Sequence, residues 1–183
     1  AAGLTHAPWL VANLQLRQPL TDKPGAPPSW DNVLYDPGTA GANPAALGYV
    51  DAMHQSLRPV PGPTVLTAYW ALGGGDRAVL SHQRQALLDE PWRTWSRRVV
   101  DHLARAHPDL PAKTTRVDLM RYGHAMAIPA PGVRGNAALQ ALAQPQMPRL
   151  HFAHGDLAGY SIFEEAFTFG HIAGNAAAKR LRG

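Results

Sequence analysis

The last part of the chain, residues 148–183, combines glycines with the start of a predicted helix, a pattern suited to binding an anion. A short apolar run over residues 150–153 predicts a strand that ends at Gly155 and Asp156. An amphipathic helix is then predicted to begin near Ser161. A tight glycine turn lets the backbone approach a ligand closely, and the first N–H groups of a helix attract negative charge. The pattern indicates a diphosphate or similar anion, although an ordinary strand–loop–helix with an acidic first turn is the alternative.

This ending, PRLHFAHGDLAGYSIFEEAF, resembles the C-terminal flavin-closing segment of FAD-dependent amine oxidoreductases, the family of monoamine and polyamine oxidases. In that family a strand ending in F-A-G-E or F-A-G-D meets the ribityl–pyrophosphate part of FAD, and the next helix points its N-terminus at the flavin ring. Glu164 falls on the glutamate of the family's G-x-x-E-G-A pattern, while Ser161 and Glu165 stand where glycines are usual. The resemblance implies that the FAD contacts are Gly155, Asp156, Ser161, Ile162, Phe163 and Glu164.

The resemblance covers most of the chain. The segments APWLVANLQL, WDNVLYD, LGYVDAMHQ, TVLTAYWAL and DLMRYGHAMAIPAPG are similar to the substrate domain of bacterial spermidine-dehydrogenase-like proteins. It implies a substrate-binding portion over residues 1–147 and the closing strand and helix of an FAD domain over residues 148–183. The GxGxxG unit that binds the dinucleotide does not occur in these residues. We therefore expect a C-terminal fragment of a flavoenzyme, which needs an N-terminal FAD-binding half and neither retains FAD nor acts alone.

The implied reaction is oxidation of an amine C–N bond by hydride transfer to flavin, in which the cofactor does the chemistry. The resemblance implies that Ile162 stands where monoamine oxidases place one of two aromatic residues before the flavin, and that the other position falls near Ala125. Candidates to line the pocket for a small amine are His124, Tyr122, Tyr69 and Trp70. The alternatives are a structural role for the histidine and a place in the core for Tyr69 and Trp70. A non-catalytic binding domain that keeps the fold without the cofactor is the alternative function.

Composition narrows the classes of protein. With 183 residues, 45% of them hydrophobic, the chain can form one domain, or one and part of another. No cysteine is present, so disulfides and thiolate metal sites are excluded, and no apolar run is long enough for a transmembrane helix. The net charge of +4 is scattered, which indicates solvated helix faces rather than a nucleic-acid surface. The sequence does not indicate the cellular compartment of the protein.

Two further motifs are weak. His151, His154 and Asp156 imitate an H-x-x-H-x-D metal site, but residues three apart on a strand face opposite sides, so we expect no metal. No GxSxG elbow is present, which leaves a serine hydrolase without support.

The expected fold is α+β, with a mixed, largely antiparallel sheet and flanking helices, as in the substrate-domain half of an amine-oxidase-like fold. Alternation and loop signals predict strands over residues 9–16, 32–35, 47–54, 64–72 and 114–128. Helical spacing predicts two helices between residues 77 and 107, the second starting at Pro91, and another over residues 135–142.

The C-terminal helix is predicted to be apolar around much of its circumference, with Phe163, Phe167 and Ile172 among its residues. The resemblance implies that an N-terminal FAD-binding half covers it. Without that cover we expect self-association through this helix, or its exchange between chains.

Overall fold

A computed structural model describes residues 3–22, 24–25, 29–34, 45–74, 76–144 and 150–182. The chain consists of two compact units. The sheet unit is Pro8–Gly123, and the C-terminal unit combines Ala1–Ala7 with His124–Gly183. The boundary predicted at residue 147 lies outside the described residues.

The described residues form an antiparallel, five-stranded sheet in the order β2-β3-β4-β1-β5. Its strands are β1 (His6–Leu16), β2 (Asp31–Asn32), β3 (Ala46–Asp51), β4 (Thr64–Ala71) and β5 (Thr114–Ala127). The helices are η1 (Ala52–Gln55), α1 (Arg77–Asp89), α2 (Trp92–Ala104), α3 (Leu110–Lys113), α4 (Ala137–Ala143), η2 (Gly155–Ala158) and α5 (Phe163–Leu181). The predicted α+β class with an antiparallel sheet and flanking helices is confirmed.

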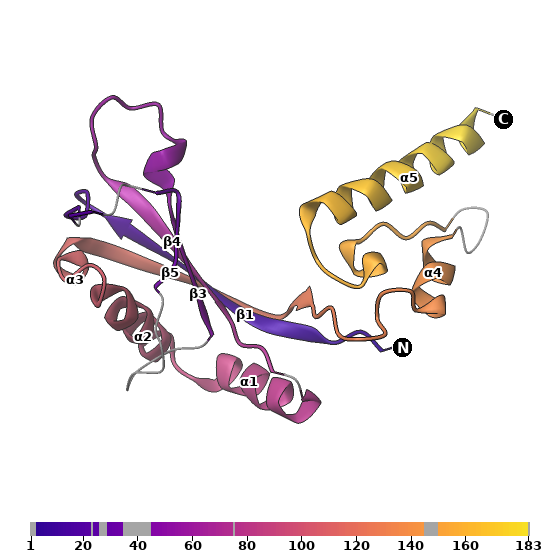
Figure 1. Cartoon of the computed structure of the whole chain (residues 1–183), viewed down its shortest axis with the longest axis horizontal. Helices are drawn as coiled ribbons and strands as arrows, with labels where there is room; N and C mark the ends of the chain where they lie inside the picture. The colour runs from indigo at the N-terminus through magenta and orange to yellow at the C-terminus, as the bar shows by residue number, and fades with distance from the viewer. Residues whose placement is uncertain are drawn as a thin grey trace. The chain divides into compact units, whose positions relative to one another are not determined.

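Buried and less buried side chains alternate along the two central strands, β1 and β4. Every second residue of β1 and β4 is buried on the same face, and the register pairs Leu10 with Trp70 and Leu14 with Leu66. This period of two directs one row of side chains to the helices α1–α3, which cover one face of the sheet (Figure 1). Each fully buried leucine on this face contributes about 1.5–3 kcal/mol to the stability of the unit.

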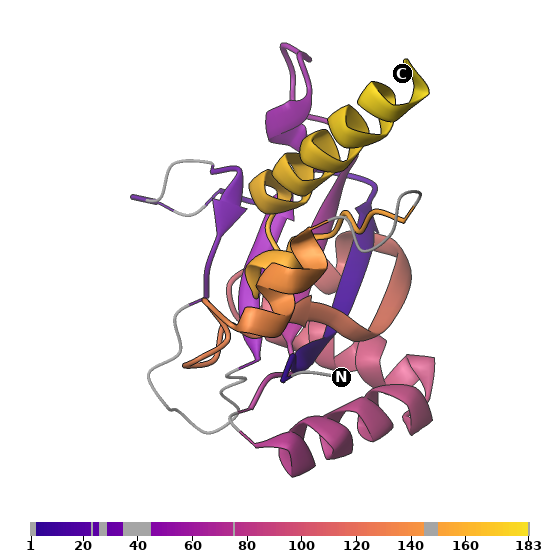
Figure 2. The same cartoon turned by 90° about the vertical axis from the view of Figure 1, so that its right-hand side faces the viewer.

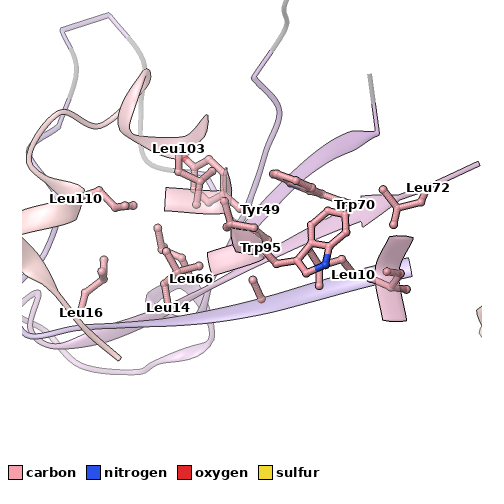
Figure 3. Close-up of a cluster of buried hydrophobic side chains, with 14 residues drawn as sticks. Leu10, Leu14, Leu16, Tyr49, Leu66, Trp70, Leu72, Trp95, Leu103 and Leu110 are labelled. Atoms are coloured by element: carbon pink, nitrogen blue, oxygen red, sulfur yellow. The ribbon is translucent and has the colours of Figure 1, made fainter. Parts of the chain in front are cut away.

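The helices complete the core with side chains spaced four apart. Trp95, Val99 and Leu103 of α2 are all less than 5% exposed and pack with the sheet residues. Trp70 meets Trp95 edge to face at 6.5 Å between ring centroids, and Figure 3 shows the two side by side. Pro91 stands at the N-terminal cap of α2, as predicted, since its fixed φ suits the start of a helix.

Three predicted strands differ from the structure. β3 ends at Asp51, and η1 occupies residues predicted as strand, because the Asp51 side chain accepts from the Met53 N–H and starts a turn. β2 is two residues long, and position 35 of its predicted span lies outside the described residues. Residues 151–154 form no strand, so the predicted closing strand over 150–153 is wrong, apart from a single bridge at Leu150. A strand needs a neighbour for its N–H and C=O groups, and apolar sequence alone does not supply one.

In the C-terminal unit, α4 and α5 both pack on the turn η2 (Figure 2). α4 begins after Asn136, whose side chain accepts from the Ala138 N–H, and it matches the predicted helix within two residues. α5 begins at Phe163, two residues later than predicted, so Ser161 precedes the helix.

Candidate functional site

The turn that precedes α5 is built around a left-handed glycine. Gly159 has φ of 83° and ends η2, where its N–H donates to the Asp156 carbonyl at 2.9 Å. Gly155 does not have a positive φ, so the tight turn predicted there lies four residues further on. Gly155 is instead buried, and a Cβ added to it would lie 3.6 Å from backbone atoms of residues 160–162, an ordinary contact distance.

The carboxylate of Asp156 joins distant parts of the C-terminal unit. His6 Nε2 lies 2.7 Å from Oδ2, and the Ser161 hydroxyl donates to Oδ1 at 3.1 Å. Ser161 Oγ in turn accepts from the Ala127 N–H at 2.9 Å. The N-terminal end of β1, the C-terminal end of β5 and the approach to α5 are therefore held by one carboxylate.

Electrostatics favour the ionised form of Asp156. Partial burial raises the pKa of this carboxyl, but hydrogen bonds from His6 and Ser161 and the nearby histidines outweigh that effect, and the net pKa is lowered. The N–H of Asp156 donates to His154 Nδ1 at 3.1 Å. A carboxylate with a lowered pKa is a weak base, so this group suits anchoring and polar contact rather than proton abstraction.

The same residues do not form a serine nucleophile. In a Ser–His–Asp triad the hydroxyl donates to the imidazole, which takes its proton. Here Ser161 donates to the carboxylate, and the imidazole of His6 contacts the other oxygen. The arrangement orders the turn and does not activate the hydroxyl.

The first turn of α5 is open to an acceptor. Ile162 occupies the N-cap position, and its side chain makes no capping hydrogen bond. Uncapped first-turn N–H groups and the helix dipole attract negative charge. Glu164 and Glu165 in the same turn oppose a second anion there, although Glu165 accepts from the Tyr160 hydroxyl at 2.7 Å. Ile162, Phe163 and Glu164 are all exposed.

An open cavity of 350 Å³ lies beside η2 within the C-terminal unit. Most of its walls are apolar, and the polar residues are two histidines and Asp156. It is lined by Leu4, Leu139, Leu142, His151, Phe152, Ala153, His154, Asp156 and Leu157. The volume falls in the range of small-molecule sites, which is about 300–1,000 Å³.

The four predicted pocket residues do not lie together in the structure. Trp70 is 3% exposed in the core, the alternative left open by the sequence. Tyr69, its neighbour on β4, faces the other side of the sheet, where it stacks on Trp9 and donates to Asp31 at 2.6 Å. Adjacent strand residues point to opposite faces, so Tyr69 and Trp70 do not line one pocket.

The other two pocket candidates lie on successive parts of β5. Tyr122 is 48% exposed in the sheet unit. His124 is exposed in the C-terminal unit, and its ring lies 6.3 Å from that of His6. His124 therefore stands near the Asp156 group, and it is the pocket candidate that the C-terminal unit brings toward the predicted cofactor contacts.

Sequence reasoning missed two features. His6 carries no local signal, since it lies 150 residues from the carboxylate that it contacts. A second cavity, of 400 Å³, lies in the sheet unit and is lined in part by Tyr49 and His107, whose polar atoms are 2.5 Å apart. Burial, followed by the charge of Asp51, raises the pKa of Tyr49, so its hydroxyl stays protonated.

The predicted metal-like motif has a different role in the structure. Among the described residues, no group of three or more histidine and acidic side chains is arranged to hold a metal ion. His154 Nδ1 accepts from the backbone of Asp156, two residues on, as a local turn contact.

Comparison with models of known protein families finds none that matches the chain, and comparison with curated proteins finds no significant match. Within the described ranges, none of the helices has the length and apolar character needed to cross a membrane.

Proposed function

We propose that the chain is part of an FAD-dependent oxidoreductase that oxidises the C–N bond of an amine. The observation that carries the proposal is the turn around Asp156 followed by the uncapped start of α5. That pairing agrees with the family pattern in the sequence, because an ordered polar turn lies beside an open cavity and is followed along the chain by uncapped backbone N–H groups.

The residues present fit a flavin in part. Phe163 and Glu164 offer uncapped backbone N–H groups that suit the negative charge of a reduced flavin, and Asp156 offers lone pairs to a ribityl hydroxyl. FAD, when bound, supplies a hydride acceptor at N5. The role of this chain is to orient the cofactor and the amine and to shield them from water. An N-terminal FAD-binding half would complete the site.

The side chains of Glu164 and Glu165 fit less well, because their negative charges oppose a reduced flavin. Both oxygens of Asp156 also have donors from the protein itself. These two observations favour the second candidate, a binding domain that keeps the fold without a cofactor.

The test begins with the coding region upstream of Ala1. A strand–GxGxxG–helix unit there, and visible flavin absorbance in the purified longer protein, are the expected results. A start codon immediately before Ala1, or a colourless protein that FAD does not reconstitute, would contradict the flavoenzyme proposal and favour the binding domain.

A pair of hydroxyl deletions then locates the cofactor. Ser161→Ala removes a donor to Asp156 and should weaken FAD binding by about tenfold, the worth of one hydrogen bond to a charged group. Thr168→Ala removes a hydroxyl that bonds only its own helix, at the Glu164 carbonyl, and should leave FAD affinity unchanged. Equal effects of the two substitutions would place the flavin elsewhere.

A further inference from the structure

The 19-residue helix α5 leaves one side largely uncovered, with Ala177 half-buried on that side. None of its residues, all of which the structure describes, is buried. Its partly covered side carries Phe169, Ala173 and Ala176, which lie near His151 and Phe152. The opposite side carries large apolar residues in the open, with Phe163 77%, Phe167 64% and Leu181 89% exposed.

The uncovered side has the spacing of a helix-pairing seam. Its residues alternate steps of four and three, which keeps them in line when two helices pack side by side. We call this set the α5 stripe: Phe163, Phe167, Gly170, Gly174, Ala177 and Leu181. Large residues stand at its ends and small ones in its middle.

We propose that the α5 stripe pairs with the α5 stripe of a second copy of this chain, in antiparallel orientation. This inference goes beyond the proposed function, and it applies to a chain in which no FAD-binding half covers α5. In a two-fold antiparallel pair centred on residue 172, Phe163 faces Leu181 of the other copy, so two large apolar residues meet. Phe167 faces Ala177, whose small side chain leaves room for the aromatic ring. Gly170 then faces Gly174, and both have open space where a Cβ would stand, so the two backbones can approach closely.

Charge selects the antiparallel direction. Glu164 lies in the first turn and Arg182 is the C-cap residue, and helical periodicity places both on the same flank of the stripe. A two-fold axis perpendicular to two antiparallel helices brings equal flanks together, so Glu164 of each copy lies beside Arg182 of the other. Parallel pairing would place like charges together and align the helix dipoles unfavourably.

The extent of the seam suits a stable pair. The helix is about 28 Å long, and it offers apolar contact at both ends and in the centre. Phe163 and Phe167 lie 6.0 Å apart, and Phe167 stacks on His171 at 6.4 Å, so the aromatic end is already ordered along the helix surface. Pre-ordered side chains lose less entropy on association.

The first measurement is the mass of the whole chain in solution as a function of concentration. We expect a dimer whose dissociation constant rises at least about tenfold with Phe167→Glu, because that change buries a charge in the seam. Leu57→Glu is the matched control, since Leu57 is a fully exposed apolar residue of the sheet unit and should leave the dimer intact. A chain that stays monomeric would overturn the proposal and leave the stripe to another occupant, such as an FAD-binding polypeptide.

The direction of pairing is tested with thiols and with charge exchange. Because the chain has no cysteine, a mixture of Phe163→Cys and Leu181→Cys chains should form mixed disulfides, whereas Phe163→Cys alone should not. Glu164→Arg and Arg182→Glu should each weaken the dimer, and the double variant should restore it. Disulfides between two copies of Phe163→Cys, or no restoration by the double variant, would overturn the antiparallel arrangement.

Discussion

Gly159→Ala tests whether the turn before α5 is held by backbone geometry and close packing. The residue has φ of 83°, and an added Cβ would lie 2.5 Å from Val133 Cγ1, a side chain that is itself buried. A left-handed conformation costs a residue with a Cβ about 1–2 kcal/mol. Forcing Val133 aside costs about 1–3 kcal/mol more. The free energy of unfolding should therefore fall by about 2–5 kcal/mol.

Two neighbouring glycines separate these contributions. Gly132 and Gly135 both have φ of 85°, and nothing lies within 4 Å of a Cβ added at either one. Gly132→Ala and Gly135→Ala should thus cost only the backbone share, about 1–2 kcal/mol. In a Val133→Ala background, which removes the obstructing methyl group, Gly159→Ala should cost the same about 1–2 kcal/mol.

The assay must report on the C-terminal unit. All five tryptophans lie between residues 8 and 123, so their fluorescence follows the sheet unit. Urea unfolding should instead be followed by far-ultraviolet circular dichroism, together with amide hydrogen exchange over residues 133–160. If Gly159→Ala costs no more than Gly135→Ala, or if Val133→Ala leaves its cost unchanged, the packing argument is refuted.

Three other predictions concern stability. The lowered pKa of Asp156 means that its contribution is present above the unfolded-state value of about 3.9 and is lost as pH falls through the folded-state value. Asp156→Asn should therefore lower the free energy of unfolding by about 1–3 kcal/mol at neutral pH, and by less in acid. Urea titrations that give the same loss at every pH would contradict this. Burial, with the hydrogen bond to Asp31, raises the pKa of Tyr69 to about 12, so that stability should decline between pH about 10 and 12. Tyr69→Phe should reduce that decline in thermal melts, and the raised pKa of Tyr49 accounts for the part that remains. Val99→Ala should cost about 1–3 kcal/mol by tryptophan fluorescence and the exposed Val60→Ala less than about 0.5 kcal/mol, and equal costs would place Val99 outside the core.

Local patterns predicted the elements in which the period of apolar residues or a terminal signal is complete. The alternation predicted β4 within one residue, and the proline marked the start of α2. β1 begins three residues earlier than predicted, at His6. The predicted strand over residues 150–153 failed because a strand depends on a partner, which no local pattern reports. For the same reason, the contact of His6 with Asp156 was not predictable from residues 150 positions apart.

The site was predicted less completely than the fold. The sequence located the turn between residues 155 and 161 but assigned the tight glycine to Gly155 instead of Gly159. A positive φ is a property of the folded backbone, and two glycines four residues apart look alike in sequence. The amine-oxidase-like fold and the flavin remain predictions that the upstream coding region and cofactor binding can test.

The division of the chain into a continuous and a discontinuous unit imposes an order on folding during synthesis. The sheet unit is one uninterrupted stretch, Pro8–Gly123, so it can fold on the ribosome as soon as that stretch has emerged. The C-terminal unit needs residues from both ends of the sequence, and His6 must wait until Asp156 has been synthesised. Throughout translation of the last sixty residues, the first strand is therefore already anchored at one end while its opening residues remain without their partners.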